Sequence, residues 1–169
     1  MNVKRILVTG ATGFLGSRTV EHLAKMEDVC VVATGRTMKP HNEVKASNVT
    51  YSLGDLADAE VVDRLVQGVD AIVHAAALSS PWGRKDAFWN ANVEPTRLLL
   101  EAAARHGVKR FVVVSTPSMY FEMKPQLGIT EDHPLPRPIN QYAASKREAE
   151  RLVTSSKIPH VVLLSLIHI

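Results

Sequence analysis

The chain has 169 residues and a mass of 18.5 kDa, which suits one α/β domain with a sizeable core and is too short for two full domains. A hydrophobic content of 46% excludes a disordered chain, and the net charge of +3 comes from scattered residues, without the basic stripe of a nucleic-acid-binding protein. There is no 18-residue apolar run or signal-peptide pattern, and Cys30 is the single cysteine. We therefore expect a cytoplasmic protein without nucleic-acid or membrane partners, disulfides or a metal site.

Short runs rich in β-branched residues alternate with longer stretches of helical period along the chain. This alternation predicts an α/β fold: a doubly wound, Rossmann-type parallel sheet flanked by helices. Pro95 is expected in a first turn or at a kink, and Cys30 inside a buried strand. The strands are expected near Val3 to Thr9, Val29 to Thr34, Thr50 to Ser52, Ala71 to His74, Arg110 to Ser115 and Val161 to Leu164, and the helices at Phe14 to Met26, Ala59 to Gln67, a long stretch ending near Arg105, and Asn140 to Ser155.

Three glycines at a spacing of three follow the first predicted strand, in Thr9-Gly10-Ala11-Thr12-Gly13-Phe14-Leu15-Gly16. A dinucleotide pyrophosphate needs a tight turn, a backbone that it can approach closely, and a helix N-terminus whose amides and dipole meet its charge. Gly10, Gly13 and Gly16 can supply these in that order. The spacing differs from the generic G-x-G-x-x-G pattern, so the position between strand and helix carries the prediction.

The same segment resembles the nucleotide turn of extended short-chain dehydrogenases/reductases, the NAD-dependent epimerase/dehydratase family. Gly54-Asp55-Leu56, His74-Ala75-Ala76-Ala77 and Asn92-Val93 resemble further marks of that family, in the same order. The resemblance implies that Asp55 holds the adenine edge and that the cofactor lies against the alanines. The cofactor-binding residues expected in this way are Gly10, Thr12, Gly13, Phe14, Leu15, Gly16, Arg36, Asp55, Leu56, Ala75, Ala76, Ala77, Asn92, Ser115, Tyr142 and Lys146.

Arg36 bears on the choice between NADP and NAD. NAD-dependent relatives carry an acidic residue at the end of the second strand, whereas this chain has Gly35-Arg36. A guanidinium can pair bidentately with a ribose 2′-phosphate. The sequence therefore favours NADP and leaves NAD as the alternative.

Tyr142 and Lys146 are four residues apart and hence lie on one face of a predicted helix. A tyrosine that exchanges protons at neutral pH needs positive charge beside it, which Lys146 can supply. The family resemblance adds Thr116, four residues before Tyr120, as the hydroxyl that binds the substrate oxygen, with Ser115 as the alternative. Phe121 replaces the glycine that is usual after that tyrosine.

We expect one NAD(P)-binding domain over residues 1–164 and assign no function to 165–169, a tail typical of truncation or of an artefact. The family resemblance covers essentially residues 2–164. It implies an NAD(P)-dependent oxidoreductase or a sugar-nucleotide-type epimerase or dehydratase whose C-terminal substrate-binding part is missing, with a small-molecule substrate. A homodimer is usual in similar proteins. The alternative is a non-catalytic NAD(P)-sensing regulator, although such proteins typically lose the tyrosine and lysine that this chain keeps.

Overall fold

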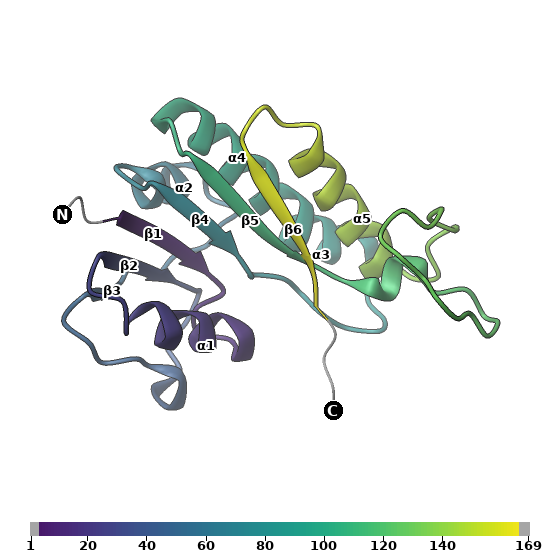
Figure 1. The fold of residues 1–169 in the computed structure, drawn as a ribbon, viewed down its shortest axis with the longest axis horizontal. Helices are drawn as coiled ribbons and strands as arrows, with labels where there is room; N and C mark the ends of the chain where they lie inside the picture. Colours follow the sequence, from purple (N-terminus) through teal and green to yellow (C-terminus); the bar gives the residue numbers. More distant parts are fainter. Residues whose placement is uncertain (1–3, 166–169) are drawn as a thin grey trace.

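Six parallel strands form one sheet in the computed structural model, which describes residues 4–165 (Figure 1). Their order in the sheet is β3-β2-β1-β4-β5-β6. The chain therefore winds outward from β1 in one direction and from β4 in the other, and the crevice between these two strands is where such sheets bind ligands. The strands are β1 Lys4–Thr9, β2 Val29–Thr34, β3 Val49–Tyr51, β4 Ala71–His74, β5 Arg110–Ser115 and β6 His160–Leu164.

Helices connect successive strands, the usual link in a parallel sheet, except between β2 and β3, where the connection contains only a 3-10 turn. They are α1 Phe14–Leu23, α2 Ala59–Val66, α3 Lys85–Phe88, α4 Glu94–His106 and α5 Gln141–Thr154. A π-helical segment, Trp89–Val93, joins α3 to α4, and Pro95 lies in the first turn of α4, as predicted. Two 3-10 turns complete the set, Pro40–Asn42 and Pro117–Tyr120.

Two apolar clusters hold the helices on the sheet. The larger one joins α2, α4 and α5 to one face, with Leu7, Ile72 and Phe111 fully buried. The smaller one joins α1 to the opposite face through Val20 and Val8. Helices therefore lie on both sides, which confirms the doubly wound Rossmann-type prediction.

The side of the sheet that α1 packs against is uncovered over its second half. Val73, Val112 and Val161 face one another across β4, β5 and β6, and Val114 pairs with Leu163 in the next row. Val161 is 40% and Leu163 49% exposed, and no helix of the described residues lies over them. An apolar surface thus remains open along β5 and β6.

The predicted strands are all present, with β3 shifted by one residue and β6 beginning one residue earlier, while Val3 lies outside the described residues. Helix α1 ends at Leu23 rather than Met26. The prediction that Cys30 is buried was wrong. Cys30 lies beside Arg5 at the amino end of the strands, where a hollow of about 480 Å³ replaces the helix layer.

Candidate cofactor-binding and catalytic site

The glycine turn, residues 10–16, lies at the carboxyl end of β1. Gly10 has a φ of +68°, and a Cβ there would lie 2.7 Å from the amide nitrogen of Ala76. A Cβ on Gly16 would overlap the Gly10 carbonyl. Gly13 is the N-cap of α1, which has no side-chain cap and no acidic residue in its first turn. The terminal amides and the dipole of α1 can therefore meet an anion.

The end of β2 supports the glycine turn from one side. Gly35 packs against the Thr12 side chain so closely that a Cβ at Gly35 would collide with the Thr12 hydroxyl. The Asn42 amide donates to the Thr12 carbonyl at 2.9 Å. Phe14 and Leu15 begin α1 with side chains that are 75% and 39% exposed. Thr12 is thus part of the turn's packing, while Phe14 and Leu15 border open space.

Arg36 and Asp55 follow two strand ends that are tied together. The Gly54 amide donates to the Gly35 carbonyl at 3.1 Å, so the chain leaves β2 and β3 at the same edge. Arg36 is exposed. The Asp55 carboxylate accepts the Ala57 amide at 3.0 Å, and Leu56 beside it is buried. The structure therefore places these predicted residues on the edge that carries the glycine turn.

Ala75, Ala76 and Ala77, the alanine segment, continue β4 past the sheet. The Ala76 amide donates to the Thr9 hydroxyl at 3.2 Å, and its backbone abuts Gly10. Asn92, which is 1% exposed, holds the next residue: its amide oxygen accepts from the Leu78 nitrogen at 2.7 Å, and its Nδ2 donates to the Leu78 oxygen at 3.1 Å. Asn92 lies in the π-helical segment, and such irregular turns are frequent at functional sites.

The Asn92 side chain also reaches the helix that carries the predicted catalytic pair. Its Nδ2 donates to the Ser145 hydroxyl at 2.9 Å, and Ser145 donates to the Tyr142 carbonyl at 2.8 Å. Helix α5 itself begins after Asn140, whose side chain caps the Ala143 amide at 2.8 Å. The start of α5 is therefore fixed from two directions.

Lys146 is 4% exposed and donates to the Val114 carbonyl of β5 at 2.7 Å. Burial lowers the pKa of Lys146 to about 8, and the negative charge of Glu150 opposes that shift. The Tyr142 ring is half-buried and packs at a tilt on Phe88, with 6.4 Å between the ring centres. The lysine is thus held beside the sheet edge on the helix turn that follows the phenol.

Thr116 and Ser115 follow directly on the carbonyl that Lys146 binds. Thr116 is 5% exposed and caps the 3-10 turn by accepting the Ser118 amide at 3.2 Å, while its hydroxyl donates to Ser118 Oγ at 3.0 Å. The Ser115 hydroxyl is buried and has no partner within the part of the chain that the structure describes. An orphaned buried hydroxyl is rare in proteins, and here it adjoins the predicted catalytic residues.

The structure thus brings most of the predicted residues to the carboxyl edge of β1, β4 and β5. His74 also hydrogen-bonds to the hydroxyls of Thr9 and Thr96. The sequence pattern did not predict these bonds, because each of the three residues looks like an ordinary strand-end or helix residue. A signal for the Asn140 cap was present, since Asn before a helical stretch is a preferred N-cap.

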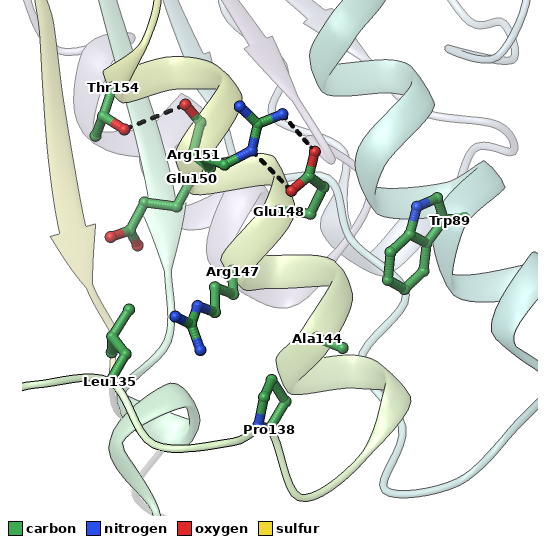
Figure 2. A pocket seen from close by; sticks show the side chains of 9 residues that line it. All are labelled: Trp89, Leu135, Pro138, Ala144, Arg147, Glu148, Glu150, Arg151 and Thr154. Atoms are coloured by element: carbon green, nitrogen blue, oxygen red, sulfur yellow. Dashed lines mark hydrogen bonds and ion pairs between the residues drawn. The ribbon is translucent and has the colours of Figure 1, made fainter.

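A separate hollow of about 420 Å³ lies on the outer side of α5 (Figure 2). Ala144, Arg147 and Arg151 border it from the helix, and Leu135 and Pro138 from the preceding loop. Lys146 points to the buried side of α5. This hollow is therefore not part of the predicted catalytic site.

Within residues 4–165, no helix is both long and apolar enough to cross a membrane. In the same range, no group of three or more histidine, cysteine, aspartate or glutamate side chains could hold a metal ion.

The chain is similar to known proteins over most of its length. The family model described as "NAD dependent epimerase/dehydratase family" matches residues 6–162. A 4-hydroxy-2-methyl-3-oxo-4-farnesyl-3,4-dihydroquinoline-1-oxide ketoreductase of Stigmatella aurantiaca is 35% identical over 92% of this chain and 46% of its own length. A dTDP-glucose 4,6-dehydratase of Streptomyces antibioticus is also 35% identical, over 92% of this chain and 49% of its own.

Among solved structures, the Bordetella bronchiseptica enzyme WbmG in complex with NAD and UDP matches with a TM-score of 0.84 and 26% identity. The match covers 96% of this chain and 53% of WbmG. The chain spans about half the length of the curated relatives it matches.

Proposed function

Because this chain belongs to the NAD-dependent epimerase/dehydratase family, we propose that it is the cofactor-binding part of an enzyme that transfers hydride between NADP or NAD and a carbonyl or hydroxyl carbon. The observation that carries the proposal is the placement of Lys146, buried on β5 one helix turn after Tyr142 and next to Ser115 and Thr116. Such a group serves proton transfer at the edge where the glycine turn lies.

The residues fit a dinucleotide at this edge. A Cβ at Gly13 would lie 3.2 Å from the Gly10 carbonyl, and a Cβ at Gly10 or Gly16 would meet backbone still more closely, so the tight turn depends on the missing side chains. We assign the pyrophosphate to residues 10–16, the ribose to Arg36, the adenine to Asp55 and Leu56, and the nicotinamide side to the alanine segment. When bound, the nicotinamide would supply or accept the hydride.

The chain's own residues would handle the proton. Tyr142 holds a proton at its phenolic oxygen and exchanges it with the substrate oxygen, and the Lys146 ammonium favours the ionised phenol by its positive charge. Because the pKa of Lys146 is about 8, the group is charged at neutral pH. Thr116 donates a hydrogen bond to the substrate oxygen, which requires its hydroxyl to turn away from Ser118.

Two of the similar proteins support different outcomes of the hydride transfer. Similarity to the Stigmatella ketoreductase supports carbonyl reduction. The match to the epimerase/dehydratase family, together with similarity to WbmG, which was solved with NAD and UDP, favours a second candidate, an epimerase of nucleotide-linked sugars.

Arg36 supports NADP as the preferred cofactor, because it is exposed at the ribose end and forms no ion pair within residues 4–165. WbmG, the solved structure described above, holds NAD, which is the alternative cofactor, so the preference for NADP rests on Arg36. The proposal also includes a cytoplasmic location, supported by the lone cysteine, and a homodimer, which size-exclusion chromatography would test.

Calorimetric titration of the purified chain with NADPH and then NADH tests the proposal. We expect tighter binding of NADPH, and reversal of the preference in Arg36→Asp, since a carboxylate repels the 2′-phosphate and accepts the ribose hydroxyls. Lys39→Asp is the matched control, since it changes the same charge in the same loop. Equal binding of both cofactors by wild type would reject the NADP preference. Binding of NADPH without turnover of any ketone or nucleotide sugar by the full-length protein would favour the sensing regulator.

A further inference from the structure

His74 is a buried titratable group that the proposed proton transfer does not use. It is 2% exposed at the end of β4 and lies between Thr9 of β1 and Thr96 of α4. Its Nδ1 is 2.7 Å from the Thr9 hydroxyl and its Nε2 is 3.0 Å from the Thr96 hydroxyl. Both ring nitrogens are therefore paired, and the ring edge packs on Phe111 at 6.0 Å between centres.

The hydroxyl partners fix the direction of each hydrogen bond. Thr96 donates its one hydrogen to the Asn92 carbonyl at 2.7 Å, so it accepts from His74 Nε2–H. The unprotonated Nδ1 then accepts the Thr9 hydroxyl hydrogen. Thr9, with its hydrogen used, accepts the Ala76 amide at 3.2 Å. One neutral tautomer, with the hydrogen on Nε2, thus gives every donor and acceptor in this series of hydrogen bonds a partner.

Electrostatics favour the same neutral state. Burial and then the positive charge of Lys146 lower the pKa of His74 to about 3. Protonation would also place a hydrogen on Nδ1 against Thr9, whose hydroxyl would lose its acceptor. The imidazole therefore stays neutral at physiological pH.

Thr9 and Gly10 are adjacent, and both act on Ala76. Thr9 accepts the Ala76 amide, and Gly10 lies so near that even a methyl group would meet the Ala76 backbone. The distance between the glycine turn and the alanine segment is therefore set by this contact. In the proposed function these two segments hold the pyrophosphate and the nicotinamide side of one dinucleotide.

We propose that His74 is a positioning residue for the dinucleotide: its imidazole orients the Thr9 hydroxyl, which holds the alanine segment at the correct distance from Gly10. This inference rests on the proposed function, because it assigns both segments to the cofactor. His74 acts through Thr9 and does not touch the reacting atoms.

Thr9→Val and Thr9→Ser form a matched pair, because only serine keeps the hydroxyl. Calorimetric titration with NADPH, at a temperature where circular dichroism shows each variant folded, should give about tenfold weaker binding for Thr9→Val, and about twofold or less for Thr9→Ser, the scale of one hydrogen bond. Rescue by serine separates positioning from loss of fold. Thr96→Val and Thr96→Ser repeat the comparison at His74 Nε2, and we expect Thr96→Val to bind NADPH about threefold more weakly than wild type.

Nitrogen-15 NMR of histidine-labelled protein gives a readout that needs no variant, and we expect the Nε2–H tautomer at pH 7. An Nδ1–H tautomer, an imidazolium, or equal NADPH binding by Thr9→Val and wild type would overturn the role of His74 alone. If Thr9→Val does not fold, the Thr96 pair and the tautomer decide. Absence of binding of both NADPH and NADH by wild type would instead reject the proposed function, and this inference with it.

Discussion

Gly10 and Gly107 share a backbone conformation but differ in their surroundings, and alanine at each position separates two effects. Their φ angles are +68° and +69°, yet a Cβ at Gly107 meets nothing within 4 Å, whereas at Gly10 it lies 2.7 to 2.9 Å from the backbone of Ala75 and Ala76. Gly107→Ala should therefore cost only the left-handed strain of about 1 kcal/mol. Gly10→Ala adds overpacking of roughly 1–3 kcal/mol, because backbone cannot move aside as a flexible side chain does.

In melting temperature, these values correspond to a fall of about 2–4 °C for Gly107→Ala and about 4–16 °C for Gly10→Ala, at roughly 2–4 °C per kcal/mol for a domain of this size. Thermal unfolding followed by circular dichroism measures both. NADPH titration should show unchanged affinity for Gly107→Ala and none for Gly10→Ala. Equal destabilisation by the two substitutions would refute the close approach of the alanine segment to Gly10.

Three further substitutions test the buried polar groups. Burial lowers the pKa of Lys146 from 10.5 to about 8, so the unfolded chain binds more protons between these values and wild-type stability rises with pH across that window. Urea unfolding at pH 7 and pH 10 should show wild type gaining about 2–3 kcal/mol relative to Lys146→Met; a constant difference would contradict this. The pKa of His74 is lowered from 6.5 to about 3, so the free energy of unfolding of wild type should fall by about 1.5 kcal/mol between pH 6.5 and pH 5. His74→Phe should not show this fall. Asn92→Leu leaves both backbone groups of Leu78 unpaired and should destabilise by about 2–4 kcal/mol, whereas a melting temperature equal to that of wild type would show that water replaces the amide.

The strands and the glycine turn were predictable because their signals are local. The run from Lys4 to Thr9 and the glycines after it specify a strand, a tight turn and a helix start within one short segment. The exposure of Cys30 was not predictable in this way. Periodicity places a residue on one face of the sheet but does not tell how far the helices extend over that face.

The hydrogen bonds that organise the site join residues far apart in sequence. Thr9 and His74 are 65 residues apart, and Asn92 and Ser145 are 53. No pattern in one sequence states such pairings. The first arises when β1 and β4 become neighbours in the sheet, and the second where the π-helical segment meets α5. The π-helical segment that contains Asn92 had one signal in the sequence, Pro95. Proline has no amide hydrogen, so it interrupts the regular series of helical backbone hydrogen bonds.

The open side of β5 and β6 has a practical consequence for anyone who handles this chain in isolation. An exposed apolar surface is formed by Val112, Val161 and Leu163. It adjoins the edge strand β6, whose outer peptide groups are available for pairing with another molecule. The fluorescence of a dye that binds apolar surfaces should therefore increase in the presence of the folded chain. The apparent molecular mass measured by light scattering should rise with protein concentration. Leu163→Lys places a charge on that surface at the edge strand and should best reduce aggregation at high protein concentration.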